Sequence, residues 1–157
     1  MIDDQIFMAQ AIALSVSGME NNEGGPFGAV VVKDGVVIGI GNNKVTSTND
    51  PTAHAEVVAI REACKHLNSF QLDGCVLYTS CEPCPMCLGA IYWARPDKIV
   101  YACTRDDAAA IDFDDAFIYE EIQTTINSRK IPMCQVSRND ALVAFKKWAE
   151  KTNKTRY

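Results

Sequence analysis

CVLYTSCEPCPMCLGAIYWARPDKIVYA, residues 75–102, is the stretch that decides the fold. It opens on an apolar run that predicts a strand over 75–79. The apolar residues 88–94 predict a helix that stops before Pro96, and residues 99–102 predict another strand. A strand, a helix and a strand in this order predict a right-handed parallel crossover, which places the chain in the α/β class.

The residues before this stretch predict a helix, a hairpin and a second helix. Apolar residues at helical spacing predict a helix over 3–19. Two β-branched runs, 29–33 and 36–40, are joined by Asp34-Gly35, a strong hairpin signal. Asp50-Pro51 supplies a possible cap and a first-turn proline, so we expect the second helix to open there and to run to about Leu67.

The residues after this stretch add weaker signals. Residues 108–122 favour partial helix, 133–136 a last strand and 140–151 a last helix. Neither a repeat nor a linker is evident, so we expect one domain over residues 1–157. The predicted architecture is a three-layer α/β/α fold, with helices on both faces of a mixed sheet of about five strands.

Charge is divided unevenly along the 157 residues, whose formal net charge is −5. Residues 138–157 carry six basic and two acidic residues, which leaves 9 basic and 18 acidic residues upstream. An acidic chain has no general attraction for nucleic acid or anionic lipid, so neither is an expected partner. The basic end could instead dock on an acidic body, its own or a partner subunit's.

The numbers of cysteines, seven, and histidines, two, limit the cellular compartment and the metal or thiol chemistry that we expect of the chain. Seven thiols cannot all pair internally, and the first basic residue, Lys33, comes too late for the charged start of a signal peptide. No apolar run approaches the ~18 residues of a membrane span. We therefore expect a cytoplasmic protein, in which clustered cysteines indicate metal binding or catalysis.

Two short motifs carry the candidate chemistry. His54-Ala55-Glu56 stands near a predicted helix start, and Cys81, Cys84 and Cys87 form two overlapping C-x-x-C pairs. Cysteines three apart on a helix share a face, and a histidine with one such pair would leave the fourth position of a tetrahedral Zn²⁺ to water. Spacing alone does not choose between Cys81/Cys84 and Cys84/Cys87.

The combined pattern makes that choice. H-x-E followed by P-C-x-x-C is the signature of the zinc deaminases, and only Cys84 and Cys87 complete it. We therefore expect His54, Cys84 and Cys87 to bind one zinc ion per chain. Glu56 would accept a proton from water and pass it on. A purely structural zinc domain would need a fourth ligand, most plausibly Cys81, and would leave Glu56 without a role.

The sequence resembles the cytidine deaminase-like superfamily and, within it, the small bacterial guanine deaminases. The matching stretches are GGPFGAV (24–30), NDPTAHAEV (49–57), YTSCEPCPMCLGAIYWARP (78–96) and FDDAFIY (113–119), together with the terminal Tyr157. The resemblance implies a hydrolase that converts guanine and water to xanthine and ammonia, with zinc as cofactor.

By the same resemblance, several residues form the purine site. Asn43 is the substrate-binding asparagine, and Asp115 is a second carboxylate that contacts the purine and shares in proton transfer. Phe27 and Trp93 lie against the base, and Ala55 also contacts the substrate. The resemblance further implies a homodimer in which the C-terminal segment 138–157 is exchanged, so that Tyr157 reaches the partner's site.

Two other substrates remain open. Guanosine or another nucleoside keeps the same base-binding edge, so the sequence separates it poorly from guanine. A tRNA adenosine deaminase shares the zinc motif, but such an enzyme normally binds RNA through a surface rich in basic residues. The basic residues of this chain gather at its C-terminal end, which argues against an RNA substrate.

Overall fold

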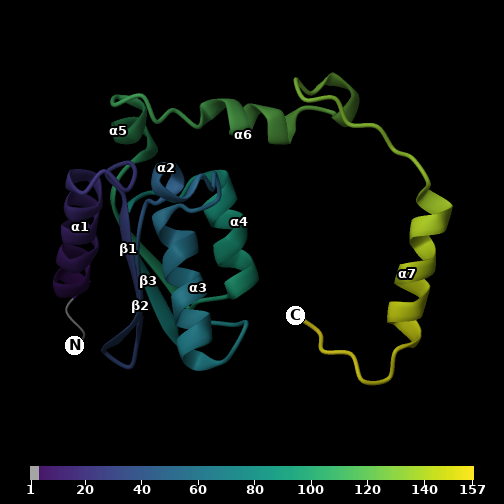
Figure 1. Cartoon of the computed structure of the whole chain (residues 1–157), viewed down its shortest axis with the longest axis horizontal. Coiled ribbons are helices and arrows are strands. Elements are labelled where there is room, and N and C mark those ends of the chain that lie inside the picture. The colour runs from purple at the N-terminus through teal and green to yellow at the C-terminus, as the bar shows by residue number, and fades with distance from the viewer. Residues whose placement is uncertain (1–3) are drawn as a thin grey trace. The chain divides into compact units, whose positions relative to one another are not determined.

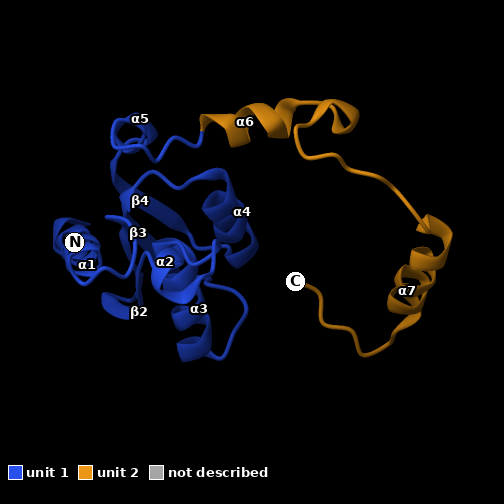
Figure 2. Cartoon of the chain, turned by 45° about the horizontal axis from the view of Figure 1, so that its top comes forward, with its two compact units in different colours: residues 1–115 blue, residues 116–157 orange. Residues whose placement is uncertain are grey.

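The computed structural model describes residues 4–157, and the chain divides into two compact units, residues 1–115 and 116–157 (Figure 2). The first unit holds the sheet and begins with α1 (Asp4–Glu20). Asp3, the expected first residue of this helix, lies outside the described residues.

A four-stranded sheet forms the middle of the first unit. Its spatial order is β2-β1-β3-β4, in which β1 pairs antiparallel with β2 and β3, and β3 pairs parallel with β4. The strands are β1 (Gly28–Lys33), β2 (Val36–Asn42), β3 (Cys75–Cys81) and β4 (Lys98–Cys103). The mixed sheet and the parallel crossover confirm the predicted class, with four strands among the described residues where about five were expected.

Helices cover both faces of the sheet, as predicted (Figure 1). Successive residues of a strand face opposite sides, and β1 shows this clearly. Val30 packs with Phe7 of α1 on one face, whereas Val31 lies in the core cluster of α3 (Ala55–Leu67) and α4 (Pro85–Ala94) on the other. Val30 and Val31 are both fully buried, so β1 lies in the middle layer with a helical layer on each side.

α3 lies unusually close to β2 because two positions of that strand lack side chains. A Cβ at Gly39 would lie 2.5 Å from the carbonyl oxygen of Ala59 and 2.7 Å from the nitrogen of Ala63. Both atoms belong to the helix backbone, which cannot rotate away. Glycine in this strand therefore sets the distance between α3 and the sheet.

We expect Gly39→Ala to destabilise the fold, because α3 must move outward and lose contact with the sheet. Overpacking of this kind costs about 1–3 kcal/mol, measurable as a lower midpoint in urea unfolding. Gly89→Ala is the matched control, since a Cβ at Gly89 meets nothing within 4 Å. Equal midpoints for the two variants would contradict the close approach.

The start of α3 differs from the prediction. The helix begins at Ala55, not at Asp50-Pro51, because the Asp50 carboxylate accepts hydrogen bonds from the backbone nitrogen and the hydroxyl of Thr52 at 2.8 and 2.7 Å. This side-chain bond closes a turn in place of a helix. The polar residues 42–50 predict a loop, and the structure has one helical turn within it, α2 (Val45–Thr48).

The remaining elements follow β4. α5 (Arg105–Ala109) closes the first unit, and the second contains α6 (Ala116–Gln123), a 3-10 turn at Ile126–Ser128 and α7 (Arg138–Glu150). The strand expected over 133–136 does not form, because no strand of its own unit is available to pair with it. None of the helices in the described part of the chain is long and apolar enough to cross a membrane.

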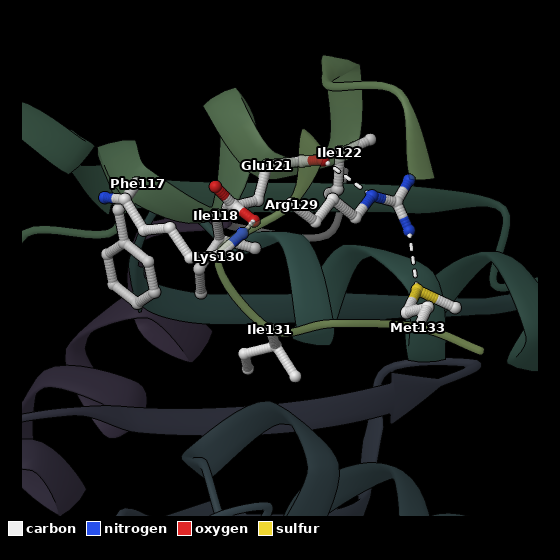
Figure 3. Close-up of a pocket in the computed structure, with 8 residues that line it drawn as sticks. All are labelled: Phe117, Ile118, Glu121, Ile122, Arg129, Lys130, Ile131 and Met133. Atoms are coloured by element: carbon white, nitrogen blue, oxygen red, sulfur yellow. Dashed lines mark hydrogen bonds between the residues drawn. The ribbon is translucent and has the colours of Figure 1, made fainter. Parts of the chain in front are cut away.

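The second unit contains an apolar hollow of about 470 Å³ beside α6 (Figure 3). Arg129 spans one end, where its Nε donates to the carbonyl of Glu121 at 3.1 Å and its Nη1 to the sulfur of Met133 at 3.3 Å. The lining residues are Phe117, Ile118, Glu121, Ile122, Arg129, Lys130, Ile131 and Met133.

The four cysteines outside the motif have apolar surroundings in the sequence, which predicts small core residues. Cys75 is buried and Cys64 is half-buried, but Cys103 and Cys134 are exposed. The expectation was wrong for these last two, because β4 is an edge strand and residues 133–136 do not join a sheet.

Candidate active site

Two helix starts bring the candidate ligands together. His54 is the residue before α3 and Cys84 the residue before α4, both in extended conformation. Neither side chain caps its own helix, so both are available to a common site. Cys87 lies in the first turn of α4, where unpaired backbone N–H groups and the helix dipole favour a thiolate.

The donor atoms of these three residues have the spacing of a zinc site. His54 Nδ1 lies 3.6 Å from Cys84 Sγ and 3.5 Å from Cys87 Sγ, and all three atoms lie within 4.8 Å of one another. Zn–S bonds of about 2.3 Å and Zn–N bonds of about 2.0–2.1 Å, at tetrahedral angles, place nitrogen and sulfur about 3.6 Å apart. The residues present therefore fit a zinc ion with three protein ligands.

The pKa values of the two thiols are shifted in opposite directions. A hydrogen bond from Cys87 is the largest cause that lowers the pKa of Cys84 to about 4, and a hydrogen bond with His54 also lowers it, whereas burial acts in the opposite direction. The same bond holds the proton on Cys87 and raises the pKa of that thiol. The Cys84 thiolate in turn raises the pKa of His54. A cation that binds here must displace this proton, as expected for thiolate ligands.

Glu56 lies directly beside this group and is only 6 % exposed. Its Oε2 accepts a hydrogen bond from Cys87 Sγ at 3.4 Å, and burial raises its pKa. A carboxylate with a raised pKa, held next to a metal site, is suited to accept a proton and return it.

Cys81, the alternative ligand, is engaged elsewhere. Its Sγ is 3.5 Å from the carbonyl oxygen of Thr104, to which it donates, and burial raises its pKa to about 11. Cys81 is not a member of the group of donor atoms that His54, Cys84 and Cys87 form. The geometry therefore favours Cys84 and Cys87.

We expect Cys84→Ala to lose bound zinc and Cys81→Ala to retain about one zinc per chain, measured by elemental analysis after gel filtration. The first change removes a thiolate from the group, whereas the second removes a thiol bonded to a carbonyl group. Equal zinc contents would show that the ligand pair is wrong.

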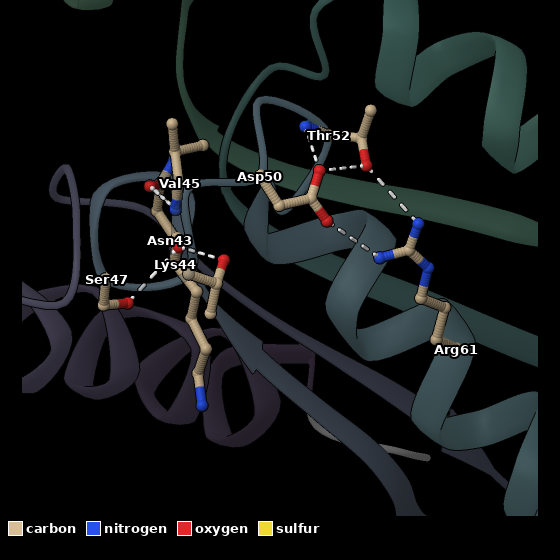
Figure 4. A network of polar contacts seen from close by, with 8 residues as sticks. Asn43, Lys44, Val45, Ser47, Asp50, Thr52 and Arg61 are labelled. Atoms are coloured by element: carbon tan, nitrogen blue, oxygen red, sulfur yellow. Dashed lines mark hydrogen bonds and ion pairs between the residues drawn. The ribbon is translucent and has the colours of Figure 1, made fainter.

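A polar segment lies next to the ligands. Asn43 is buried, its backbone nitrogen donates to the carbonyl of Phe27 at 3.0 Å, and its Oδ1 accepts from the backbone nitrogen of Val45 at 3.1 Å (Figure 4). The next residue, Lys44, donates its backbone N–H to the carbonyl of Ala53 at 2.9 Å. One backbone bond thus joins the Asn43 segment to the residue before His54.

Phe27, whose carbonyl accepts the bond from Asn43, belongs to an aromatic pair. The rings of Phe27 and Phe113 meet edge to face at 5.0 Å, and Phe113 comes two residues before Asp115. Burial raises the pKa of Asp115, and the negative charge of Cys84 raises it further. The sequence reasoning gave Phe113 no role, although its position in the FDD segment was a usable signal.

Three other expected site residues are placed less directly. Ala55 is fully buried at the start of α3, next to His54. Trp93 lies near the end of α4 and is 63 % exposed. The described residues of its own unit therefore do not enclose its ring in a substrate pocket. Tyr157 belongs to the second unit, where it is 69 % exposed.

Comparison with known proteins agrees with this geometry. Residues 1–103 match the family described as the cytidine and deoxycytidylate deaminase zinc-binding region. Over 99% of its length the chain is 54% identical to a guanine deaminase of Bacillus subtilis, all of which it covers. A crystal structure of guanine deaminase from that organism superposes with a TM-score of 0.95, at 55% identity and 98% coverage of both chains.

A tRNA-specific adenosine deaminase of Bacillus subtilis is a partial match, 40% identical over 64% of this chain and 62% of its own length.

The family match and the geometry of the ligands confirm the zinc-binding family and the zinc cofactor expected from the sequence. Because the likeness to the guanine enzyme extends over nearly the whole chain, the protein belongs to the cytidine and deoxycytidylate deaminase zinc-binding family and, within it, to the guanine deaminases.

Proposed function

We propose that the chain hydrolyses guanine to xanthine and ammonia at a zinc ion held by His54, Cys84 and Cys87. The observation that carries this proposal is the meeting of these three donor atoms beside a buried carboxylate, Glu56. A structural zinc domain would have a fourth protein ligand, and Cys81 is not part of the group.

Zinc, when bound, activates water as a nucleophile near neutral pH. The chain's own contribution is proton transfer. Glu56 accepts the first proton that water gives up and delivers it to a ring nitrogen of the purine. It then takes the second proton from the oxygen that has added to the ring and passes it to the amino group, which leaves as ammonia. Burial of Glu56 suits both steps, because a carboxyl with a raised pKa gives up its proton less readily to solvent.

We expect Glu56→Gln to retain zinc and the wild-type melting temperature but to lose about 10²–10⁴-fold in kcat, the usual contribution of a general acid–base group. The amide has the shape of the carboxylate but cannot accept the proton. Activity above about a hundredth of wild type, by the same range, would contradict the shuttle role. Zinc content and melting are measured on the same sample.

The remaining residues recognise the base in this proposal. Asp115 accepts hydrogen bonds from the N1–H and amino edge of guanine and shares in proton transfer, while Asn43 binds the purine. Phe27 and Trp93 contact the faces of the ring, and Ala55 lies beside it. A carboxylate that the wrong base leaves unpaired in a closed site is costly, so this edge discriminates strongly.

The substrate is tested by ammonia release from guanine, guanosine, cytosine, adenine and a tRNA anticodon stem. We expect guanine to be turned over fastest, because the matched guanine deaminase aligns over its whole length. Faster turnover of guanosine would move the proposal to a nucleoside deaminase. Release from the RNA alone would favour the tRNA enzyme, which matches this chain over a shorter stretch.

We further propose a single functional domain over residues 1–157, working as a homodimer in which residues 138–157 are exchanged and Tyr157 enters the partner's site. The basic charge of these residues complements the acidic remainder of the chain. The first unit also exposes Tyr92 and Trp93 on α4, and β4 is an edge strand with Tyr101 exposed. Large exposed aromatic side chains are typical of a surface that a partner covers.

Mixing two inactive chains tests the exchange. One chain carries Glu56→Gln and the other lacks Tyr157. If Tyr157 acts across the dimer, the mixed dimer has one site with Glu56 from one chain and Tyr157 from the other. We then expect mixing after mild unfolding to restore up to about a quarter of wild-type activity, because half of the dimers are mixed and each has one complete site. Absence of recovery, with mixed dimers shown by mass, would contradict the exchange.

We also propose a cytoplasmic location. All seven cysteines carry free thiols, and free, metal-binding cysteines are typical of a reducing compartment.

A further inference from the structure

Glu23 holds the chain on both sides of Asn43. Its carboxylate accepts a hydrogen bond from the side-chain nitrogen of Asn42 at 2.5 Å. Its backbone carbonyl accepts two more, from the hydroxyl of Thr46 and the backbone nitrogen of Ser47, each at 3.2 Å. One residue of the glycine-rich loop therefore fixes the residue before Asn43 and the start of the helical turn after it.

Gly24 lies directly against Asn43 itself. A Cβ at this position would be 2.2 Å from Asn43 Oδ1, 2.5 Å from its carbonyl oxygen and 2.8 Å from its carbonyl carbon. The side-chain oxygen could rotate away, but the two backbone atoms could not. Any side chain at position 24 must therefore displace Asn43 as a whole.

The same surroundings decide which end of the Asn43 amide is free. Oδ1 is occupied by the N–H of Val45, as Figure 4 shows. An N–H can donate only to the oxygen of an amide, so this bond fixes which end of the Asn43 amide is the nitrogen, and Nδ2 can donate to another molecule. The site thus presents a hydrogen-bond donor, which pairs with an acceptor atom such as a ring nitrogen or the carbonyl oxygen of a purine.

We propose that Glu23 and Gly24 are positioning residues that hold Asn43 with its amide nitrogen directed at the substrate. The inference rests on the proposed function, since it assigns Asn43 to purine binding. Neither residue contacts the reacting atoms; both act through Asn43. A displacement of about 1 Å in a substrate-positioning group costs about 10²-fold in rate, so a small movement of this amide is measurable.

Four variants test the proposal in steady-state assays with guanine. We expect Gly24→Ala to lower kcat/KM about tenfold to a hundredfold, and Glu23→Ala to lower it as well. Glu23→Gln keeps an oxygen that accepts from Asn42, so it restores most of the loss. Gly89→Ala, where an added Cβ meets nothing within 4 Å, is the matched control and leaves kcat/KM unchanged.

A general loss of structure is separated from positioning by the Asn43→Ala background. If Gly24 and Glu23 act through the Asn43 amide, their substitution causes no further loss once that amide is absent. Equal losses in both backgrounds would overturn the proposal, as would unchanged kinetics in Gly24→Ala. If Gly24→Ala loses zinc or fails to melt cooperatively, the comparison of Glu23→Ala with Glu23→Gln decides.

A measurement without substrate separates this proposal from the proposed reaction. The side-chain amide signals of Asn43 in the ¹⁵N NMR spectrum, assigned by their disappearance in Asn43→Asp, should shift in Gly24→Ala and Glu23→Ala and stay in place in Gly89→Ala. Unshifted signals would overturn the positioning role. Failure of the zinc-loaded wild type to release ammonia from guanine would overturn the reaction, whatever these signals show.

Discussion

The meeting of two helix starts is the constraint on which the rest of the site depends. His54 precedes α3 and Cys84 precedes α4, and their donor atoms must come within one metal's reach although thirty residues separate them. The sheet makes this possible, because α3 and α4 pack on the same face (Figure 1). Helix N-termini also favour thiolates, so position and charge support the same ligand set.

The loops around this point are tied to one another by polar contacts (Figure 4). Lys44 bonds to Ala53, which precedes His54, and Asp50 holds the turn through Thr52 and an ion pair with Arg61 of α3 at 3.6 Å. A backbone hydrogen bond therefore connects the Asn43 segment to the segment that carries His54. Precise geometry of this kind is what catalytic sites require, and rigid elements supply it best.

Much of this organisation was predictable from local sequence. The hairpin at Asp34-Gly35, the strands beginning at Val36 and Cys75, and the parallel crossover all follow from residue type and spacing. The start of α3 was not, because the Thr52 bonds to Asp50 compete with the helix that proline favours. The strand expected over 133–136 also failed, since strand formation requires a pairing partner that residue type cannot supply.

The sequence by itself determined the chemistry. H-x-E and P-C-x-x-C predict the metal, the ligand types and the proposed proton carrier, because these depend on residue identity and short spacing. Only the tertiary structure decided how closely the three donor atoms approach one another, that Cys81 bonds to Thr104, and that Glu23 and Gly24 enclose Asn43. These are contacts between segments distant in the chain, and packing of helices on a sheet sets them, not the pattern of any one segment.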